Sequence, residues 1–412
     1  MSAENATALR ILIGLEGLAL GGCPINALDL ARTVRARGHE VWVFAVDEDV
    51  KVSLLPYAEQ AGFAVQILPA EAGLLARSRQ IGDLARRHHA DVVHVYAPWL
   101  GPPASIGVSR RSECAVVVTN WTMANDVRTA SHAPLIVGTK DLQIEASAYQ
   151  RSPVSLIEPP VDLDRDHPDA VEAKAFRAQY GIAEDELCAV IVSRLDQVMK
   201  AEGIGYALRA VENLDDPGLR LVVVGDGDVF EMLNAQAEQI NASLGRPAVV
   251  MTGSLIDPHP AYAAADFMLG MGGSALRSLA HAQPLIVLGE QGFARVFEPQ
   301  STGYFYDAGF FGHGCAGDPV EHLRRVMSTL TDPDRRGRLG EFGLAQVRER
   351  FSLAAAADQL ETVYRQAVLN LPPRRVRTGE AARLLAHQGA RLSRGWLRKL
   401  GRRQARRDGR TG

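Results

Sequence analysis

Two cations follow one short apolar run and are spaced so that both could reach the same ligand. The run 189–192 is followed by Arg194, and Lys200 stands six positions further on. A guanidinium can form two hydrogen bonds to one phosphate group, and an ammonium adds a mobile point charge. Charge that builds up on a departing phosphate is stabilised by fixed cations of this kind. The pair predicts a site for a phosphorylated ligand, although two solvated surface cations would give the same pattern.

Small residues follow two other apolar runs, and each group precedes a helical pattern. Gly21 and Gly22 stand before a helical pattern at 26–37, and Gly272-Gly273-Ser274 follows the run 267–271. The first N–H groups of a helix have no partner inside the helix and can bind an anion. Glycine keeps the backbone open to such a ligand. Both groups are candidate anion sites, and a plain turn is the alternative for Gly21 and Gly22.

Two more polar side chains are candidates for contact with a second ligand. His94 lies toward the carboxyl end of the run 92–96, and Asp126 follows Trp121 in a predicted loop together with Arg128. An imidazole at a strand end can reach a cleft, whereas a core histidine with both nitrogens bonded would give the same sequence pattern. Both interpretations of His94 stay open at this point, and Asp126 is a candidate by position alone.

The elements that must position these residues are apolar runs separated by helical patterns. The runs are 11–15, 41–46, 64–68, 92–96, 115–119 and 135–137 in the first half, and 188–192, 221–224, 248–251, 267–271, 285–288 and 303–306 in the second. Their nearly continuous Val, Ile and Leu content indicates parallel strands covered on both faces. Such sheets bind ligands beyond the carboxyl ends of their strands. The pattern predicts the α/β class, with two doubly wound parallel-sheet domains facing each other across a cleft.

A proline-rich stretch from Pro153 to Pro168 separates the two series and predicts a linker, because proline does not continue a helix or a central strand. We therefore assign residues 1–160 to a first domain and 161–350 to a second. A helical pattern that Ser352 can cap fills residues 351–370, and we expect it to pack back toward the first domain.

The remaining residues, 371–412, form a basic tail. They hold 13 Arg or Lys against Glu380 and Asp408, whereas the whole chain of 412 residues has a net charge of -3. Apolar residues that fall near one helical face are Leu385, Leu392, Trp396 and Leu400. An amphipathic helix of this kind suits an anionic membrane surface, and a disordered tail is the alternative. The acidic body of the chain argues against a nucleic-acid partner.

The cysteines indicate a reducing compartment. They are far apart, without CxxC pairs or neighbouring histidines: Cys23, Cys114, Cys188 and Cys315. This spacing favours free thiols over disulfides or a metal site. Glu16 interrupts the apolar run 11–20, which argues against a signal peptide, and no run approaches the roughly 18 residues of a spanning helix. We expect a cytoplasmic protein, with the tail as a possible contact to the inner face of the membrane.

Taken in order, several segments resemble retaining glycosyltransferases of the GT-B fold, specifically family four, the glycosyl transferases group 1. Over residues 10–370 the similar segments are Gly21-Gly22, Gly38-His39-Glu40-Val41, 91–95, 157–162, 193–196 with Lys200, and 265–266 with 274–276 and 282–284. The resemblance rests on their order, since none of these segments is specific alone. It implies two Rossmann-like domains, a nucleotide-sugar donor held by the second domain and an acceptor held by the first, with no metal and no cofactor.

The resemblance also assigns roles. It makes Arg194 and Lys200 the catalytic cations on the diphosphate, one position further apart than is common in the family. It implies donor binding by Gly21, Gly22, Gly272, Gly273, Ser274 and Glu290. It implies acceptor binding by His94, Trp121 and Asp126.

Three departures from the family pattern bear on activity. Trp121 stands where the family commonly has a histidine that contacts the reacting sugar, and the two glutamates of the donor loop fall on Leu269 and Arg277. A guanidinium has no acceptor for a ribose hydroxyl, so Glu290 is the predicted substitute. We expect retaining transfer to a secondary metabolite, a lipid or a polysaccharide. The alternative is a non-catalytic binding or scaffold protein that has lost the glutamate pair.

Overall fold

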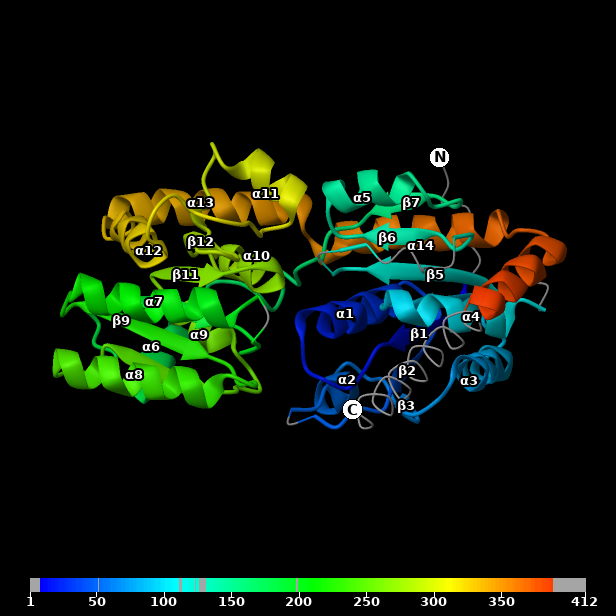
Figure 1. Ribbon diagram of the computed structural model, residues 1–412, viewed down its shortest axis with the longest axis horizontal. Helices are drawn as coiled ribbons and strands as arrows, with labels where there is room; N and C mark the ends of the chain where they lie inside the picture. The colour runs from blue at the N-terminus through cyan, green and yellow to red at the C-terminus, as the bar shows by residue number, and fades with distance from the viewer. Residues whose placement is uncertain are drawn as a thin grey trace, which may run out of the picture.

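The chain forms two α/β domains that lie side by side, each built on its own sheet (Figure 1). The computed structural model describes residues 8–50, 52–110, 113–122, 124–125, 131–197 and 199–387. The elements of the first domain are β1 (Arg10–Leu15), α1 (Gly22–Ala36), β2 (Glu40–Val46), α2 (Leu55–Gln60), β3 (Val65–Leu68), α3 (Leu74–Arg87), β4 (Val92–Val95), η1 (Pro98–Leu100), α4 (Gly101–Val108), β5 (Ala115–Asn120), β6 (Leu135–Val137), α5 (Lys140–Ser147) and β7 (Val154–Leu156).

The second domain follows after a linker that includes residues 157–169. Its elements are α6 (Ala170–Gln179), β8 (Leu187–Val192), α7 (Ala201–Leu214), β9 (Leu219–Val224), α8 (Phe230–Leu244), β10 (Val249–Gly253), α9 (His259–Ala264), β11 (Phe267–Gly270), α10 (Gly272–Ala280), β12 (Leu285–Leu288), β13 (Ala294–Val296), α11 (Thr302–Ala308), α12 (Pro319–Ser328) and α13 (Pro333–Arg350). The last described helix with assigned bounds is α14 (Leu353–Leu369).

Both sheets are wound outward in two directions from their first strand. The first has the order β3-β2-β1-β4-β5-β6-β7, and the second has the order β10-β9-β8-β11-β12-β13. All pairs are parallel except β12 with β13, which is antiparallel. The winding therefore reverses between β1 and β4 and between β8 and β11. At such a switch point the two connections leave in opposite directions and open a crevice at the carboxyl ends of the strands.

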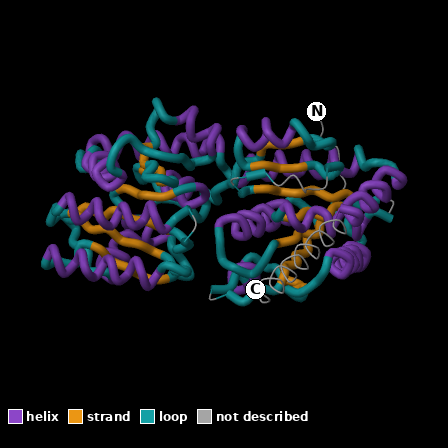
Figure 2. The backbone as a smooth tube through the Cα atoms, viewed as in Figure 1, coloured by secondary structure: helices purple, strands orange, loops and turns teal. Residues whose placement is uncertain are grey.

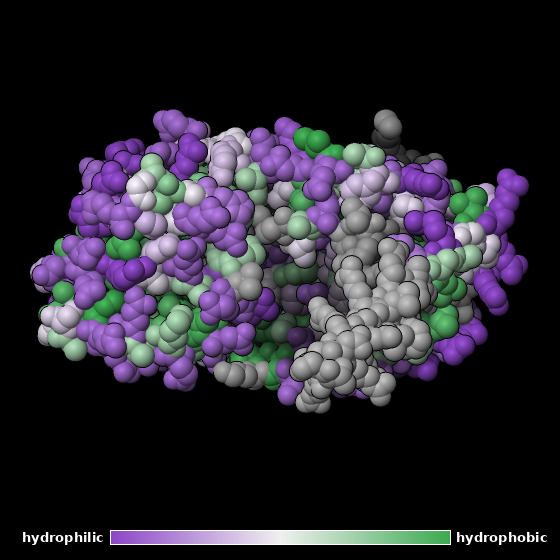
Figure 3. Space-filling model, viewed as in Figure 1, coloured by the Kyte–Doolittle hydropathy of each residue, from purple (hydrophilic) through white to green (hydrophobic). Residues whose placement is uncertain are grey.

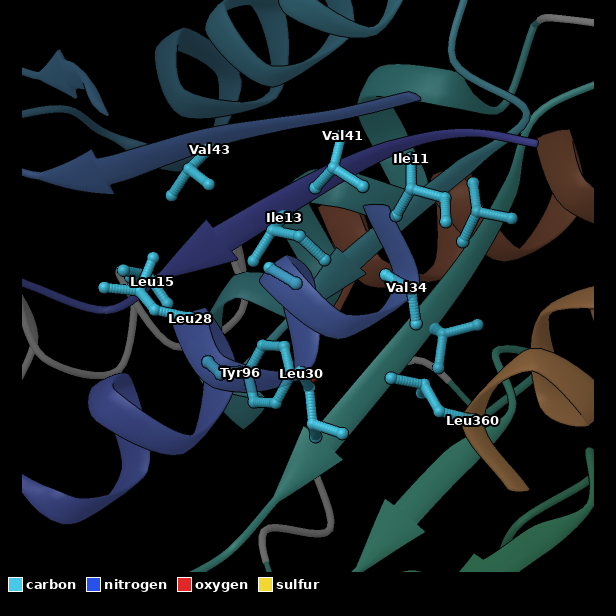
Figure 4. Close-up of a cluster of buried hydrophobic side chains, with 14 of the residues drawn as sticks. Ile11, Ile13, Leu15, Leu28, Leu30, Val34, Val41, Val43, Tyr96 and Leu360 are labelled. Atoms are coloured by element: carbon cyan, nitrogen blue, oxygen red, sulfur yellow. The ribbon is translucent and has the colours of Figure 1, made fainter. Parts of the chain in front are cut away.

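Burial explains why the strand sequences are almost continuously apolar. Every residue of β4 and of β9 is buried, and Figure 2 shows helices on both sides of the strands. One face of the first sheet packs on α1 and α14, where Ile11, Val34 and Leu360 belong to one cluster (Figure 4). Strands buried on both faces cannot alternate polar and apolar residues, so the predicted parallel sheets follow directly from this composition.

The predicted elements need three corrections. The run 303–306 is part of α11, in which Phe305 is fully buried while Tyr304 is 40% exposed. Its aromatic residues favour a strand by propensity, but packing decides the outcome. The short strand β7 lies inside the stretch predicted as linker, and β13 was not predicted. Both have three residues, too few to give a clear period.

The chain end completes the first domain. Ser352 caps α14 by accepting a hydrogen bond from the Ala355 N–H, as predicted. Leu360 and Tyr364 are buried with strands of the first sheet, and Arg37, which directly follows α1, pairs with Asp358 at 2.6 Å. The first domain is thus built from two separate parts of the sequence.

Part of the predicted basic tail is a docked helix. Residues 374–387 are helical, and Figure 1 shows this helix beside α4. Ala381 and Leu384 are buried, with Leu384 among the apolar residues of the first domain, and Glu380 accepts a 2.8 Å hydrogen bond from the Ser131 N–H. An apolar pair three residues apart gives the helix a face to bury. Leu392, Trp396 and Leu400 lie outside the described residues, and no helix within the described ranges is long and apolar enough to cross a membrane.

Candidate functional site

The predicted site residues lie on loops that leave the two switch points. The loop after β1 carries Gly21 and Gly22, the loop after β8 carries Arg194 and Lys200, and Gly272 follows β11. Because β8 and β11 are parallel neighbours, the last two loops share one edge of the second sheet. In the space-filling view the surface is hollowed between the two domains (Figure 3). The topology therefore brings these loops to facing edges of one hollow.

Arg194 and Lys200 lie close together at the end of β8. The Arg194 side chain is 58% exposed and its Nε donates a 2.7 Å hydrogen bond to Asp196 Oδ2. Lys200 precedes the first residue of α7, and burial together with the charge of Arg194 lowers its pKa. Two neighbouring cations repel each other, and an anion between them would relieve that repulsion. The pair is arranged to receive negative charge.

A close approach of two loops fixes the place of Arg194. Gly225 follows β9 with φ +145°, and a Cβ there would lie 1.8 Å from the Ser193 carbonyl oxygen. The Leu195 N–H donates to the Asp226 carbonyl oxygen at 2.9 Å, which holds the two loops together. Glycine is therefore required after β9 so that the segment 193–195 can pass over it.

A carboxylate of the first domain interacts with Arg194. Glu16 directly follows β1, and it interacts electrostatically with Arg194 and by a hydrogen bond with Trp99. The pKa of Glu16 is raised overall. Burial and the charge of Glu48 raise it, and they outweigh the hydrogen bond with Trp99 and the charge of Arg194, which lower it. Trp99 itself is 44% exposed after β4. Glu16 and Trp99 therefore line the first-domain side of the hollow, at its switch point.

The helices α1 and α10 both begin without a side-chain cap among the described residues. Gly22 opens α1, where a Cβ would meet nothing within 4 Å, and no acidic residue stands in the first turn. At α10, the Gly272 N–H donates to the Phe310 carbonyl oxygen, and the Ser274 hydroxyl donates to the Met271 carbonyl oxygen. The Ser274 side chain is thus used inside its own helix. The free backbone donors of the two helix starts remain as the anion-binding groups.

Glu290 lies at the same edge of the second sheet, after β12. Its Oε2 is 3.2 Å from His313 Nδ1, and its side chain is 34% exposed. The neighbouring Gln291 N–H donates to Glu202 Oε2 on the first turn of α7, at 2.9 Å. The loop of Glu290 is therefore tied to the helix that Lys200 precedes, and contact of Glu290 with a ribose stays a prediction.

The prediction that His94 binds an acceptor was wrong. His94 is fully buried, with Nδ1 2.7 Å from Tyr364 Oη and Nε2 2.7 Å from Thr119 Oγ1. Burial lowers its pKa to about 3. The side chain points from β4 toward the sheet face that α14 covers, so it joins α14 to β4 and β5 and does not reach the hollow.

The other two predicted acceptor residues have different outcomes. The Trp121 Nε1–H donates to the Ile157 carbonyl oxygen at 2.8 Å, and the ring lies 5.3 Å from that of Tyr96. Its N–H group is used within the domain, and contact of its ring with an acceptor stays a prediction. Asp126 lies outside the residues that the structure describes, as does Arg128.

Arg277, which stands where the resemblance places a glutamate, connects the domains. Its Nη2 donates a 3.1 Å hydrogen bond to Asn26 Oδ1 on α1, and its Nε lies 3.7 Å from Asp166 Oδ2 in the linker. The side chain is only 11% exposed. The sequence analysis did not identify Arg277 or Glu16 as residues that contact the other domain. For Glu16 there was a usable signal, because it is a charged residue directly after the apolar run 11–15.

The described ranges contain no group of three or more His, Cys, Asp or Glu side chains arranged to hold a metal ion. Independence of metal and of cofactor therefore stays a prediction from the resemblance.

Comparison with known proteins supports the fold. Residues 187–316 match a family model described as "Glycosyl transferases group 1". Anabaena HepE in complex with UDP has a TM-score of 0.65 at 15% identity, covering 86% of this chain and 99% of that chain. A glycosyltransferase of Rickettsia africae gives 0.64 at 11%, covering 88% and 100%.

The catalytic domain of Arabidopsis thaliana starch synthase IV, bound to ADP and acarbose, gives a TM-score of 0.64 at 13% identity and covers 88% of this chain and 100% of that chain. The comparison with curated proteins found no match. These similarities, with the two facing parallel-sheet domains, confirm the predicted GT-B fold.

Proposed function

We propose that the protein is a glycosyltransferase that moves a sugar from a nucleoside-diphosphate sugar to a hydroxyl acceptor. The observation that carries this proposal is the pair Arg194 and Lys200 beside the open start of α10. The family match at residues 187–316 covers both cations and that helix start. Support also comes from structures of the same fold whose names include UDP-glucose, or UDP and GlcNAc. The second domain holds the donor, and the first holds the acceptor.

The chemistry needs stabilisation of the leaving diphosphate. The bond between the anomeric carbon and the phosphate oxygen breaks, the acceptor oxygen bonds to that carbon, and its proton passes to the departing phosphate. Arg194, Lys200 and the backbone donors at Gly273 and Ser274 stabilise the negative charge that develops. By the resemblance, transfer retains the anomeric configuration, uses no enzyme nucleophile and needs no metal.

A non-catalytic binding protein is the second candidate, and one observation favours it. Both positions of the donor-loop glutamates lack a carboxylate: Leu269 is fully buried in the sheet, and Arg277 is engaged with Asn26 and Asp166. A protein of this kind would bind a nucleotide without turning it over.

Nucleotide binding and donor turnover separate the two functions. We expect UDP or ADP to raise the melting temperature, and the matching nucleotide sugar to be hydrolysed slowly without acceptor. Arg194→Ala or Lys200→Ala should weaken nucleotide binding by about tenfold or more, since each removes a charge-assisted contact. Arg209→Ala, which removes an arginine stacked on Tyr206 of α7, is the matched control.

Each result has a definite meaning. Nucleotide binding that depends on Arg194 but gives no hydrolysis and no transfer indicates the binding protein. No binding of any nucleoside diphosphate refutes both functions. For an active enzyme, NMR of the product anomer tests retention, and activity in EDTA tests metal independence.

The acceptor class and the place of action extend the proposal. A secondary metabolite, a lipid and a polysaccharide all remain candidate acceptors. Residues 388–412, with nine Arg or Lys against Asp408, fit contact with an anionic membrane on the cytoplasmic side.

A further inference from the structure

The guanidinium of Arg277 connects three parts of the chain that meet beside the proposed donor site. It belongs to α10 of the second domain, it donates to Asn26 of α1 in the first domain, and it faces Asp166 of the linker. Figure 1 shows α1 and α10 next to each other where the domains meet, and the two helices are in contact. The Arg277 side chain therefore contacts the first domain and the linker from the second domain.

Both partners of Arg277 are themselves fixed. Asn26 is 2% exposed on α1. Asp166 is fully buried, with His259 Nε2 at 3.0 Å and His281 Nε2 at 3.8 Å, and its N–H donates to the Asp162 carbonyl oxygen at 2.7 Å. Solvent and salt screen buried partners less than the partners of an exposed ion pair.

The contact joins two helices that both begin open to an anion. Asn26 is four residues after Gly22, and Arg277 is four residues after Gly273, so each lies on the same helix face as the start of its helix. A Cβ built at Gly273 would lie 3.7 Å from Arg277 Nη1. The Asn26–Arg277 hydrogen bond therefore links α1 to α10 about one turn after Gly22 and Gly273.

Charge explains why an arginine replaces the expected glutamate here. A carboxylate at position 277 would face the buried carboxylate of Asp166, and Asp29 of α1 also interacts electrostatically with Arg277. Like charges in a buried site cost more than the surrounding contacts supply. In this chain the position serves the junction between the domains.

On the basis of the proposed function, we propose that Arg277 is a positioning residue. Its contacts with Asn26 and Asp166 keep the starts of α1 and α10 facing one diphosphate. Transfer requires groups of both domains around the same donor, whereas binding of the nucleotide requires mainly the second domain. Loss of Arg277 therefore affects the turnover of bound donor more than the affinity for nucleotide.

The experiment compares substitutions on both sides of the contact. Arg277→Met and Arg277→Glu should lower kcat for donor turnover by about tenfold or more and change the Kd for UDP or ADP by less than about threefold. Solution scattering should show both variants to be more extended than the wild-type protein without ligand. Arg209→Met, in α7, is the matched control and should match the wild-type protein in both measurements.

Substitutions of Asn26 test the contact from the other domain. Asn26→Asp keeps an acceptor for Arg277 and should retain wild-type scattering and a kcat within about threefold. Asn26→Lys places two cations together and should give the same lower kcat and more extended scattering as Arg277→Met. In the double variant Arg277→Met with Asn26→Leu, the second substitution should lower kcat by less than about a further twofold, because the contact is already lost.

Several outcomes overturn the inference. The inference is wrong if Arg277→Met keeps wild-type scattering and wild-type kcat. It is also wrong if Arg277→Met lowers thermal stability but changes neither scattering nor kcat. Where Arg277→Glu fails to fold, Arg277→Met and Asn26→Lys carry the test. If the wild-type protein neither binds nor turns over a nucleotide sugar, the proposed function fails, while the scattering of the Arg277 and Asn26 variants still decides whether this contact holds the domains together.

Discussion

Arg194 and Lys200 differ in how far each side chain is exposed to solvent and to a ligand. Arg194 is more than half exposed and already shares its Nε with Asp196, so its two terminal nitrogens are the groups left for a phosphate. Lys200 is partly buried, and its lowered pKa reflects the loss of water around the ammonium group and the nearby guanidinium. A diphosphate between them would satisfy both charges. The cost of keeping two cations together is thus recovered when the donor binds.

Replacing His94 tests its new assignment as a structural residue. His94→Phe removes both ring hydrogen bonds and leaves Tyr364 Oη and Thr119 Oγ1 buried without this partner. We expect the free energy of unfolding to fall by about 2–4 kcal/mol, because two buried polar groups lose their partner. Urea unfolding measures this change.

Tyr304→Phe, at a side chain that is 40% exposed, is the control and should change stability by less than about 0.5 kcal/mol. If His94→Phe keeps wild-type stability and raises the KM for the acceptor, His94 contacts the acceptor and belongs to the site.

Single residues were predicted where a local pattern carries the chemistry, and missed where the contact depends on the arrangement of domains. Arg194 and Lys200 follow one strand, so spacing alone placed them together. Asn26 and Arg277 are 251 positions apart, and no local pattern relates them. His94 was misjudged because a strand alternates its side chains between two faces, and the sequence does not say which face a helix from the chain end will cover.

At the level of elements, the loop pair after β8 and β9 determines whether Arg194 is in place. Gly225→Ala would force a Cβ against the Ser193 carbonyl oxygen and require φ +145° from a residue with a side chain. We expect the loop to move, nucleotide affinity to fall by about tenfold or more, and stability to fall by about 2 kcal/mol or more. Calorimetric titration with UDP or ADP and urea unfolding measure the two effects.

Gly245→Ala separates strain from displacement of the loop. Gly245 also has a positive φ, +64°, but a Cβ there would meet nothing within 4 Å. We expect a loss of about 1 kcal/mol in stability and unchanged nucleotide affinity. Equal nucleotide affinity in the two variants would contradict a role for Gly225 in placing Arg194.

The elements themselves were largely predictable because covered parallel strands have a strong apolar signal. The strands β6 and β12 have the predicted bounds, and most others differ by one or two residues at an end. Predictions failed for β7, β13 and the helix of residues 374–387, whose formation depends on neighbours that are distant in sequence. Short elements carry too little periodicity to stand out before their packing is known.

For the whole molecule, the linker carries much of the charge that joins the domains. Arg32 of α1 pairs with Asp162 at 2.6 Å, and Arg165 hydrogen-bonds Tyr57 of α2 and approaches Asp29 Oδ2 at 3.4 Å. Asp166 then faces His259 of α9. The linker therefore binds both domains, and its ion pairs make the stability of this junction depend on pH.

His259 gives that dependence a definite sign. Burial by itself would lower the pKa of His259, but hydrogen bonds and charge interactions with Asp166 and Asp257 outweigh it and raise the pKa to about 9, above the ordinary 6.5. Arg165 and Arg277 face the same Asp166, and the His281 ring lies 6.1 Å from that of His259. A pKa raised by folding means that protonated His259 stabilises the native state. This contribution is complete below about pH 6.5 and is lost as the pH rises toward about 9.

We therefore expect the free energy of unfolding of the wild-type protein to fall between these two pH values, and His259→Gln to remove most of that slope. Urea unfolding as a function of pH measures it. His167→Gln, at an exposed histidine of the same linker, is the control and should keep the wild-type slope. If His259→Gln also keeps that slope, protonation of His259 does not stabilise the junction, because a neutral amide cannot carry the charge that Asp166 pairs with in the wild-type protein.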